Sequence, residues 1–356
     1  MSFPALGRQT HMTHETQQSQ GEADAVVAAV RAGDDAAFST LVARHKRELQ
    51  VHCYRMLGLL EDSEDLVQET FLRAWRRRET FQGRASVRAW LYRIATNACL
   101  DALARRPRPA PASDVADRAG EPQEAFEVLW LQPYPDKLLA GIAPDENEPH
   151  AAVVGKETIE LAFMVAIQQL PPRQRAVLIL RDVLDWPAKD AAELLDSSVA
   201  SVNSALQRAR AALKEHLPAR RLEWAPGADE TKEERALVRR YVEATERADA
   251  EAFVGMMRED ARFTMPPEPG VWVGRDKIVG AWTEGGAFDT ERFGHMRGVV
   301  TRANMQPAVA GYLRRPGDTE YRPLALDVIR IEEGAVAEII AFPDTVFPAF
   351  GLPPTL

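Results

Sequence analysis

One predicted helix carries a polar face whose side chains are suited to contact nucleic acid. Apolar residues at spacings of three and four predict a helix over about 199–216, with an inner side of Val199, Val202, Leu206, Ala209 and Leu213. Its outward side chains are Ser201, Asn203, Ser204, Gln207, Arg208 and Arg210. Amides and hydroxyls can hydrogen-bond to base edges in a DNA major groove, and guanidinium groups can bind phosphates. On pattern alone, a helical hairpin with a solvated polar face is an equally good interpretation.

A shorter helix and a turn precede this helix and would set its orientation. Pro187 suits the first turn of a helix over about 187–195, and residues 196–198 form a short turn without glycine. Two helices joined in this way form a helix-turn-helix. The surrounding block, about 157–217, is helical throughout and is interrupted by prolines.

Positive charge is concentrated in two stretches of a chain whose formal net charge is -9. Residues 71–106 contain nine arginines against two acidic residues, and residues 197–221 contain five basic residues against one. The stretches 107–155 and 222–356 carry net charges of -6 and -7. The two basic stretches are therefore candidate phosphate-facing surfaces, whereas direct DNA binding by the acidic C-terminal part is not expected.

The 356 residues divide into segments of different composition. The predicted segments are a disordered tail (1–22), a helical domain (23–106), an acidic and proline-rich linker (107–155), a second helical domain (156–221), an α+β domain (228–346) and a C-terminal tail (347–356). In the first domain, Ser63 is the expected N-cap of a helix that runs to Trp75, and another helix follows over about 86–103. Large apolar residues at 128–139 interrupt the linker, and we expect them to be buried.

The C-terminal domain shows a change from helical to strand periodicity. Helices are predicted over about 231–247, 250–257 and 275–284. Short β-branched runs predict strands over 261–265, 271–273, 298–302, 309–313, 324–331 and 336–341. This order implies one curved sheet folded over helices.

Several classes of protein are disfavoured by composition. No apolar run is long enough to span a membrane, and the polar N-terminus does not resemble a signal peptide, so a cytoplasmic location is expected. Cys53 and Cys99 lie in apolar helical patterns and are expected to be small buried side chains. Neither a metal site nor a cofactor is expected.

Two motifs resemble the sigma-70 family of RNA polymerase sigma factors. The string 170–178, followed by the helix-turn-helix and the sequence 207–210, resembles region four of that family. The strings 64–75 and 90–101 resemble region two. With only these two regions, the chain resembles the extracytoplasmic-function group, and its last domain and the linker string 130–136 resemble the subgroup with a SnoaL-like, ketosteroid-isomerase-like extension. This resemblance implies two all-α domains and a cone-shaped α+β domain in a protein that directs promoter-specific transcription initiation without covalent chemistry.

The resemblance also implies partners and contact residues. The expected partners are core RNA polymerase, through its β′ clamp and β flap, and promoter DNA. Core polymerase would contact Asp65, Gln68, Glu69, Arg73 and Trp75. The minus-ten element would contact Arg84, Arg88, Trp90, Tyr92, Arg93, Asn97 and Asp101. The six outward residues of 199–216 would contact the minus-thirty-five element.

Some of these residues could instead have a purely structural role. Helix 65–75 could be an ordinary surface helix, and Trp90 could belong to the core. Asp101 could accept a hydrogen bond from cytosine N4 or be a simple helix residue, because a carboxylate repels phosphate.

The C-terminal domain is expected to modulate sigma activity in cis, with a small ligand in its pocket as a further expectation. Members of the family it resembles can be enzymes that use a buried Asp or His. Candidates here are His295, Asp327 and Asp344, with Tyr241 and Tyr312, although no pair has diagnostic spacing. The alternatives are an enzyme or ligand-binding domain tethered to a DNA-binding module, and a plain helix-turn-helix repressor.

Overall fold

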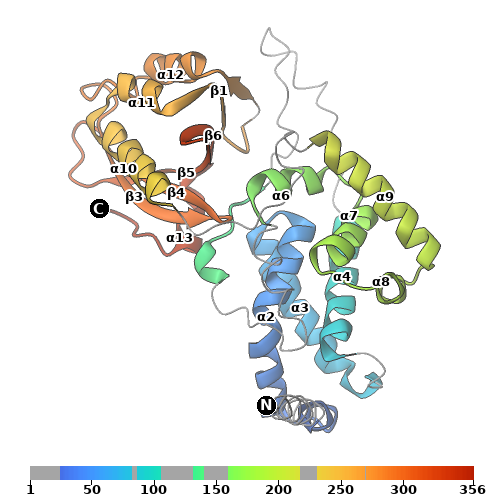
Figure 1. The fold of residues 1–356 in the computed structure, drawn as a ribbon. Coiled ribbons are helices and arrows are strands. Elements are labelled where there is room, and N and C mark those ends of the chain that lie inside the picture. Colours follow the sequence, from blue (N-terminus) through green and yellow to red (C-terminus); the bar gives the residue numbers. More distant parts are fainter. Residues whose placement is uncertain (1–24, 82–85, 106–130, 140–158, 217–230, 269) are drawn as a thin grey trace, which may run out of the picture.

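The computed structural model describes residues 25–81, 86–105, 131–139, 159–216, 231–268 and 270–356. Within them, a helical part lies beside a domain built on a single sheet (Figure 1). Among the described helices, none combines the length and hydropathy needed to cross a membrane.

The first helical unit begins with a short helix over residues 25–31 and continues with α2 (Asp35–Leu57), α3 (Leu60–Arg76) and α4 (Val87–Arg105). Asp34 caps α2 by accepting from the N–H groups of Ala36 and Ala37. The prediction that Ser63 is the N-cap of the next helix is wrong, because α3 begins three residues earlier. The N–H of Leu60 donates instead to the side-chain oxygen of Gln132 in the linker, at 2.8 Å. A cap supplied by a distant residue leaves no local sequence signal.

The second helical unit consists of α6 (Leu161–Gln168), α7 (Pro172–Leu178), a π-helical turn (Ile179–Val183), α8 (Ala188–Leu194) and α9 (Val199–His216). The last two form the predicted helix-turn-helix. The turn contains no glycine, and Asp196 adopts the left-handed conformation there, with φ 47°. Four of the five expected inner residues of α9 are buried, but Val199 is 42% exposed. The expectation that Val199 faces inward is wrong, because Val199 is the first residue of α9 and lies at the turn.

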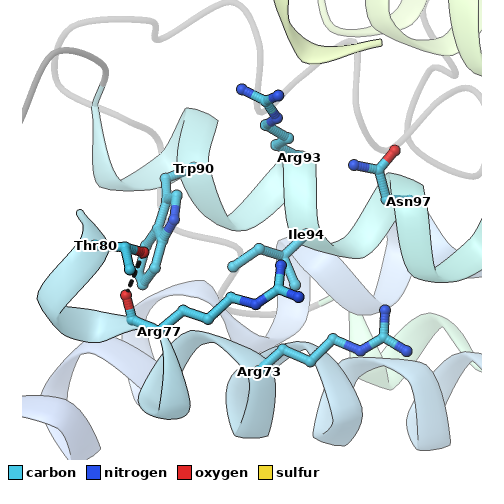
Figure 2. A pocket seen from close by; sticks show the side chains of 7 residues that line it. All are labelled: Arg73, Arg77, Thr80, Trp90, Arg93, Ile94 and Asn97. Atoms are coloured by element: carbon cyan, nitrogen blue, oxygen red, sulfur yellow. Dashed lines mark hydrogen bonds between the residues drawn. The ribbon is translucent and has the colours of Figure 1, made fainter. Parts of the chain in front are cut away.

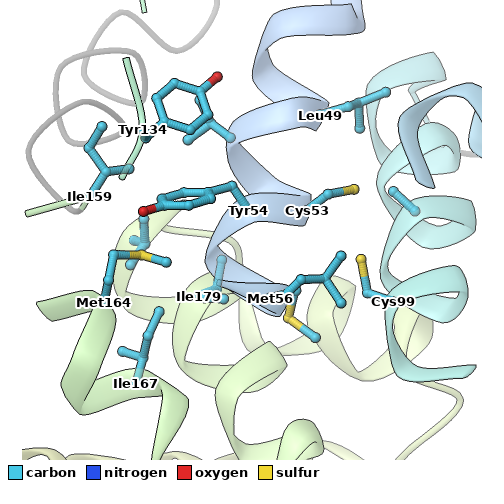
Figure 3. Packing of buried hydrophobic residues seen from close by; sticks show 14 of the residues in the cluster. Leu49, Cys53, Tyr54, Met56, Cys99, Tyr134, Ile159, Met164, Ile167 and Ile179 are labelled. Carbon is cyan, nitrogen blue, oxygen red and sulfur yellow. The ribbon is translucent and has the colours of Figure 1, made fainter. Parts of the chain in front are cut away.

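One apolar core joins the two helical units (Figure 3). Cys53 and Met56 from α2 lie near Cys99 from α4, while Met164 and Ile167 of α6 pack from the other side. Both cysteines are buried and free, as expected. The two units therefore form one packed body in this structure.

The C-terminal domain has a six-stranded sheet in the order β2-β1-β6-β5-β4-β3. The strands are β1 (Met257–Thr264), β2 (Val271–Val273), β3 (His295–Ala303), β4 (Gln306–Arg314), β5 (Arg322–Glu332) and β6 (Ala335–Pro343). All six predicted strands are confirmed. Helices α10 (Lys232–Arg247), α11 (Ala250–Met256) and α12 (Arg275–Glu284) cover one face (Figure 1).

The two faces of this sheet contribute to different cores. Val309, Ile329 and Ile339 pack with the covering helices, whereas Leu326 and Phe342 on the other face join the core of the helical part. The C-terminal residues also pack on that second face: the Phe347 ring of α13 (Phe347–Phe350) lies 5.3 Å from the ring of Tyr312. The prediction of a tail over 347–356 is therefore wrong, since its aromatic residues are buried against the sheet.

Linker residues 131–139 lie between the first helical unit and the sheet, and Leu131, Tyr134 and Leu139 are buried, as expected for this apolar run. Residues 128–130 are outside the described part of the chain. The Tyr54 hydroxyl donates to the Gln132 carbonyl at 2.7 Å, and Asp136 accepts from the N–H of Met305 at 2.8 Å. Burial raises the pKa of the Asp136 carboxyl. The linker is thus anchored on both neighbouring bodies.

Candidate nucleic-acid interface

A pocket of about 330 Å³ lies between the end of α3 and the start of α4 (Figure 2). Its lining residues are Arg73, Arg77, Thr80, Trp90, Arg93, Ile94 and Asn97. Three are arginines and none is acidic. The Thr80 hydroxyl donates to the Arg77 carbonyl at 2.7 Å, which fixes the turn after α3. Arginines beside an indole ring and an amide can bind the phosphate, the face and the edge of an unstacked nucleotide.

The pocket collects residues that the sequence had assigned to two different partners. Trp90, Arg93 and Asn97 belong to the expected minus-ten set, whereas Arg73 was expected to contact polymerase. Arg77 and Thr80 were missed. The excess of arginine over 71–106 pointed to the former, but no sequence signal pointed to Thr80.

The structure does not place Tyr92 at this surface, which corrects the expectation that it contacts DNA. Its side chain is fully buried, with the ring 4.8 Å from that of His52 and 5.4 Å from that of Trp186. Burial raises the pKa of the Tyr92 hydroxyl, which donates to Glu48 at 3.2 Å. Arg88 is also turned inward, because its Nε donates to Glu48 at 2.8 Å.

Burial by itself would raise the pKa of the Glu48 carboxyl, but hydrogen bonds and charge from His45 and Arg88 bring it below its ordinary value. Glu48 is therefore ionised and holds Arg88 in the interior. Asp101 is exposed and lies 3.7 Å from Arg73, so its carboxylate neutralises an arginine of the pocket rim. Arg84 is outside the described residues.

A second exposed surface lies on α3. Asp65 and Gln68 are exposed, and Leu72 one turn further is 51% exposed. Trp75 is not an exposed anchor, since its ring lies 4.9 Å from the ring of Phe38 and under the Arg78 guanidinium. The spacing of 65, 68 and 72 places all three on one helix face, a signal that could have identified Leu72.

Glu69 and Arg73 on α3 are paired with each other. The Arg73 Nε donates to the Glu69 carboxylate at 2.8 Å, which lowers the pKa of Glu69. This is the i,i+4 pair of an ordinary surface helix, so these two residues are less available to a partner than Asp65 and Gln68.

The polar face of α9 is the third exposed surface. All six of its expected contact residues are exposed: Ser201, Asn203, Ser204, Gln207, Arg208 and Arg210. Arg210 makes a bidentate ion pair with Asp182, with distances of 2.8 and 2.7 Å, and this raises the pKa of its guanidinium.

Arg175 connects the two helical units, a role that sequence reasoning missed. Its guanidinium is buried and donates to the carbonyls of Ile167 at 2.9 Å and Gln168 at 2.7 Å. It also donates to the carbonyl of Met56 at the end of α2. These carbonyl oxygens, together with the side-chain oxygen of Gln168, provide hydrogen-bond acceptors for the buried guanidinium.

Only one pair of the candidate residues in the C-terminal domain is brought together. The Tyr241 hydroxyl donates to Asp327 at 2.9 Å, and burial raises the pKa of the Asp327 carboxyl to about 6. His295 and Asp344 are exposed, and Tyr312 donates to the Pro353 carbonyl.

Three family descriptions match the chain. Residues 41–108 match Sigma-70 region 2, residues 160–213 match Sigma-70 region 4, and residues 238–339 match the SnoaL-like domain.

Named relatives match over half of the chain or more. The ECF RNA polymerase sigma factor SigG of Mycobacterium tuberculosis is 43% identical over 333 residues, which cover 92% of this chain and 86% of that protein. SigJ of the same species is 29% identical over 84% of this chain and 90% of its own length. SigW of Bacillus subtilis is 31% identical over 53% of this chain and 92% of its length. The crystal structure of M. tuberculosis SigJ has the same fold, with a TM-score of 0.57 at 23% identity over 88% of this chain and 99% of that one.

Proposed function

The chain belongs to the extracytoplasmic-function group of sigma-70 factors, which direct RNA polymerase to specific promoters, and we propose that it divides this task among three surfaces of its helical part. Its partners are RNA polymerase and promoter DNA. The surfaces are the pocket between α3 and α4, the polar face of α9 and the exposed face of α3.

The pocket between α3 and α4 receives an unpaired base of the minus-ten element. Its arginines neutralise the strand, Arg77 above all because Arg73 is paired with Glu69, and Trp90 offers an aromatic face for stacking. Asn97 can hydrogen-bond to a base edge. This combination of charge, stacking face and amide in one pocket is the observation that carries the proposal.

The face of α9 contacts the minus-thirty-five element. Helix α9 is the second helix of the helix-turn-helix, and recognition helices of this kind enter the major groove. Its exposed hydroxyl and amide side chains suit base edges, while Arg208 suits a phosphate.

The exposed face of α3 contacts the β′ clamp of core polymerase, and the second helical unit contacts the β flap. A partly exposed leucine flanked by Asp65 and Gln68 is typical of a helix that packs on another helix, with an apolar centre and a polar rim. Leu72 therefore replaces Trp75 as the apolar anchor of this surface.

The C-terminal domain modulates sigma activity in cis through the linker. The turn between β3 and β4 contacts the linker at Asp136, and Lys137 Nζ lies against Gly351 after α13. Because the linker connects the two DNA-binding units, a domain that holds it also limits how those units move apart.

Binding of a small ligand in the C-terminal domain is a second candidate function, supported by the Tyr241–Asp327 pair. A carboxyl with a pKa of about 6 can donate or accept a proton near neutral pH. Asp327→Asn is expected to lose ligand binding while transcription stays unchanged. That result would separate the ligand site from the sigma function.

Run-off transcription with purified core polymerase on genomic DNA tests the main proposal. The chain is expected to produce discrete transcripts that start downstream of a shared promoter sequence. Arg77→Ala is expected to reduce their yield about tenfold, the effect of losing one charge-assisted hydrogen bond. Arg44→Ala, which removes an exposed arginine of α2 outside the pocket, is the matched control. Equal yields from both variants would exclude the pocket as the DNA site.

A further inference from the structure

The turn of the helix-turn-helix lies against the pocket between α3 and α4. Arg93 of the pocket wall forms an ion pair with Asp196 of this turn, with 2.6 Å between its Nη2 and the carboxylate Oδ1. Figure 2 shows the Arg93 side chain pointing away from α3. One of the three arginines of the pocket is therefore occupied by a carboxylate from the other DNA-binding unit.

Aromatic packing extends this contact along α4. The ring of Trp186, which precedes α8, lies 5.4 Å from that of Tyr92, and both side chains are buried. Trp186 is part of the cover over Tyr92. In this structure region 4 is consequently closed over the same helix that carries Trp90, Arg93 and Asn97.

The ion pair has the chemistry of a phosphate contact. A carboxylate oxygen and a phosphate oxygen both accept charge-assisted hydrogen bonds from a guanidinium at about 2.7–2.9 Å. The Arg93 side chain is partly exposed, and a promoter phosphate that accepted from its Nη2 would replace the Asp196 carboxylate there.

We propose that Asp196 is a built-in competitor of promoter DNA, which occupies Arg93 while region 4 is packed over α4 and is displaced when a phosphate binds that guanidinium. This inference rests on the proposed role of the pocket. Separation of the two DNA-binding units and binding of the minus-ten strand are then coupled, because both require the same ion pair to break.

The Arg93–Asp196 ion pair is weak enough to be exchanged reversibly. The side chains of Arg93 and Asp196 are 43% and 70% exposed, and exposed ion pairs shift an equilibrium only severalfold. A phosphate can therefore displace Asp196 from Arg93 at little cost, whereas separation of the two units also has to expose the apolar core that joins them. The left-handed turn at Asp196 also accommodates asparagine, so Asp196→Asn removes the charge without disturbing the backbone.

Affinity of the full chain for single-stranded DNA tests the proposal. The probe is a fluorescein-labelled DNA of mixed sequence and about 12 nucleotides, followed by anisotropy. Asp196→Asn is expected to bind about two- to fivefold more tightly than the parent, the range that corresponds to one exposed ion pair. Asp190→Asn, which removes an exposed carboxylate of α8 nearby, is the matched control and is expected to bind like the parent.

Arg77→Ala separates failure of this proposal from failure of the pocket. If Arg77→Ala weakens binding while Asp196→Asn equals the parent, the competition is overturned and the pocket remains the DNA site. If Arg77→Ala is also unchanged, the pocket is not the site and both proposals fail. An equal gain in Asp190→Asn would assign the effect to overall charge and would also overturn the competition.

Discussion

Asn304 and Tyr134 are joined by two hydrogen bonds across the junction between the C-terminal domain and the linker. The Tyr134 N–H donates to Asn304 Oδ1 at 2.7 Å, and the Asn304 N–H donates to the Tyr134 carbonyl at 2.9 Å. The Asn304 amide also donates to the hydroxyl of Tyr54 on α2, at 2.9 Å. One buried side chain therefore connects the C-terminal domain to both the linker and the first helical unit.

Asn304→Gly is expected to loosen this junction. Glycine accepts the left-handed φ of 54° but removes the amide, leaving buried polar groups unpaired at a cost of about 2–3 kcal/mol. Urea denaturation measures the loss, and hydrogen exchange at residues 131–139 is expected to accelerate. Ala248→Gly, another left-handed position, is the control. Unchanged exchange at 131–139 would show that the amide does not hold the linker.

Asp327 is expected to make stability depend on pH. Its folded pKa of about 6 lies above the ordinary value of 3.8, so the folded state favours the protonated form. Its contribution is therefore fully present below about pH 4 and is lost as pH rises to about 6. Asp327→Asn should gain up to about 3 kcal/mol relative to the parent over that interval, since one pKa unit is about 1.4 kcal/mol. Thermal unfolding of both proteins at about pH 4.0 and 7.5 measures this difference in stability. A parallel response of the exposed control Asp344→Asn would contradict the assignment.

Leu72→Ala is expected to weaken binding to core RNA polymerase about tenfold while leaving thermal stability unchanged. The side chain is 51% exposed, so the fold loses little when it is truncated, whereas an interface would lose a central apolar contact. Val300→Ala, which truncates a 53% exposed side chain of β3, is the control in the same pull-down or calorimetric titration. Asp65→Ala or Gln68→Ala should have smaller effects in the same direction. Parental affinity of Leu72→Ala would remove this face of α3 from the interface.

Arg208→Ala is expected to weaken promoter binding and to lower the salt dependence by about one counterion, the signature of one lost phosphate contact. Affinity for duplex promoter DNA at two or more salt concentrations measures both. Lys189→Ala on α8 is a control that removes one exposed positive charge from the first helix of the same motif. A variant with lower affinity but the parental salt slope would show that Arg208 does not contact phosphate.

The sequence by itself determined the elements and much of the polar face of α9. The spacing of apolar residues is a local property, and it predicted α9 and all six strands because those elements bury one side and expose the other. Motif strings likewise identified the two sigma regions. Leu72 could have been found in the same way, because helical spacing alone places it with Asp65 and Gln68.

Tertiary structure decided which polar residues are available. Tyr92 and Arg88 have the right chemistry for DNA, but Glu48 on another helix binds both, and Trp186 covers Tyr92. The start of α3 is capped by a linker residue rather than by Ser63. Contacts between residues far apart in sequence leave no periodic signal, so the pocket, the Arg93–Asp196 pair and the Asn304–Tyr134 junction exist only once packing has brought their elements together.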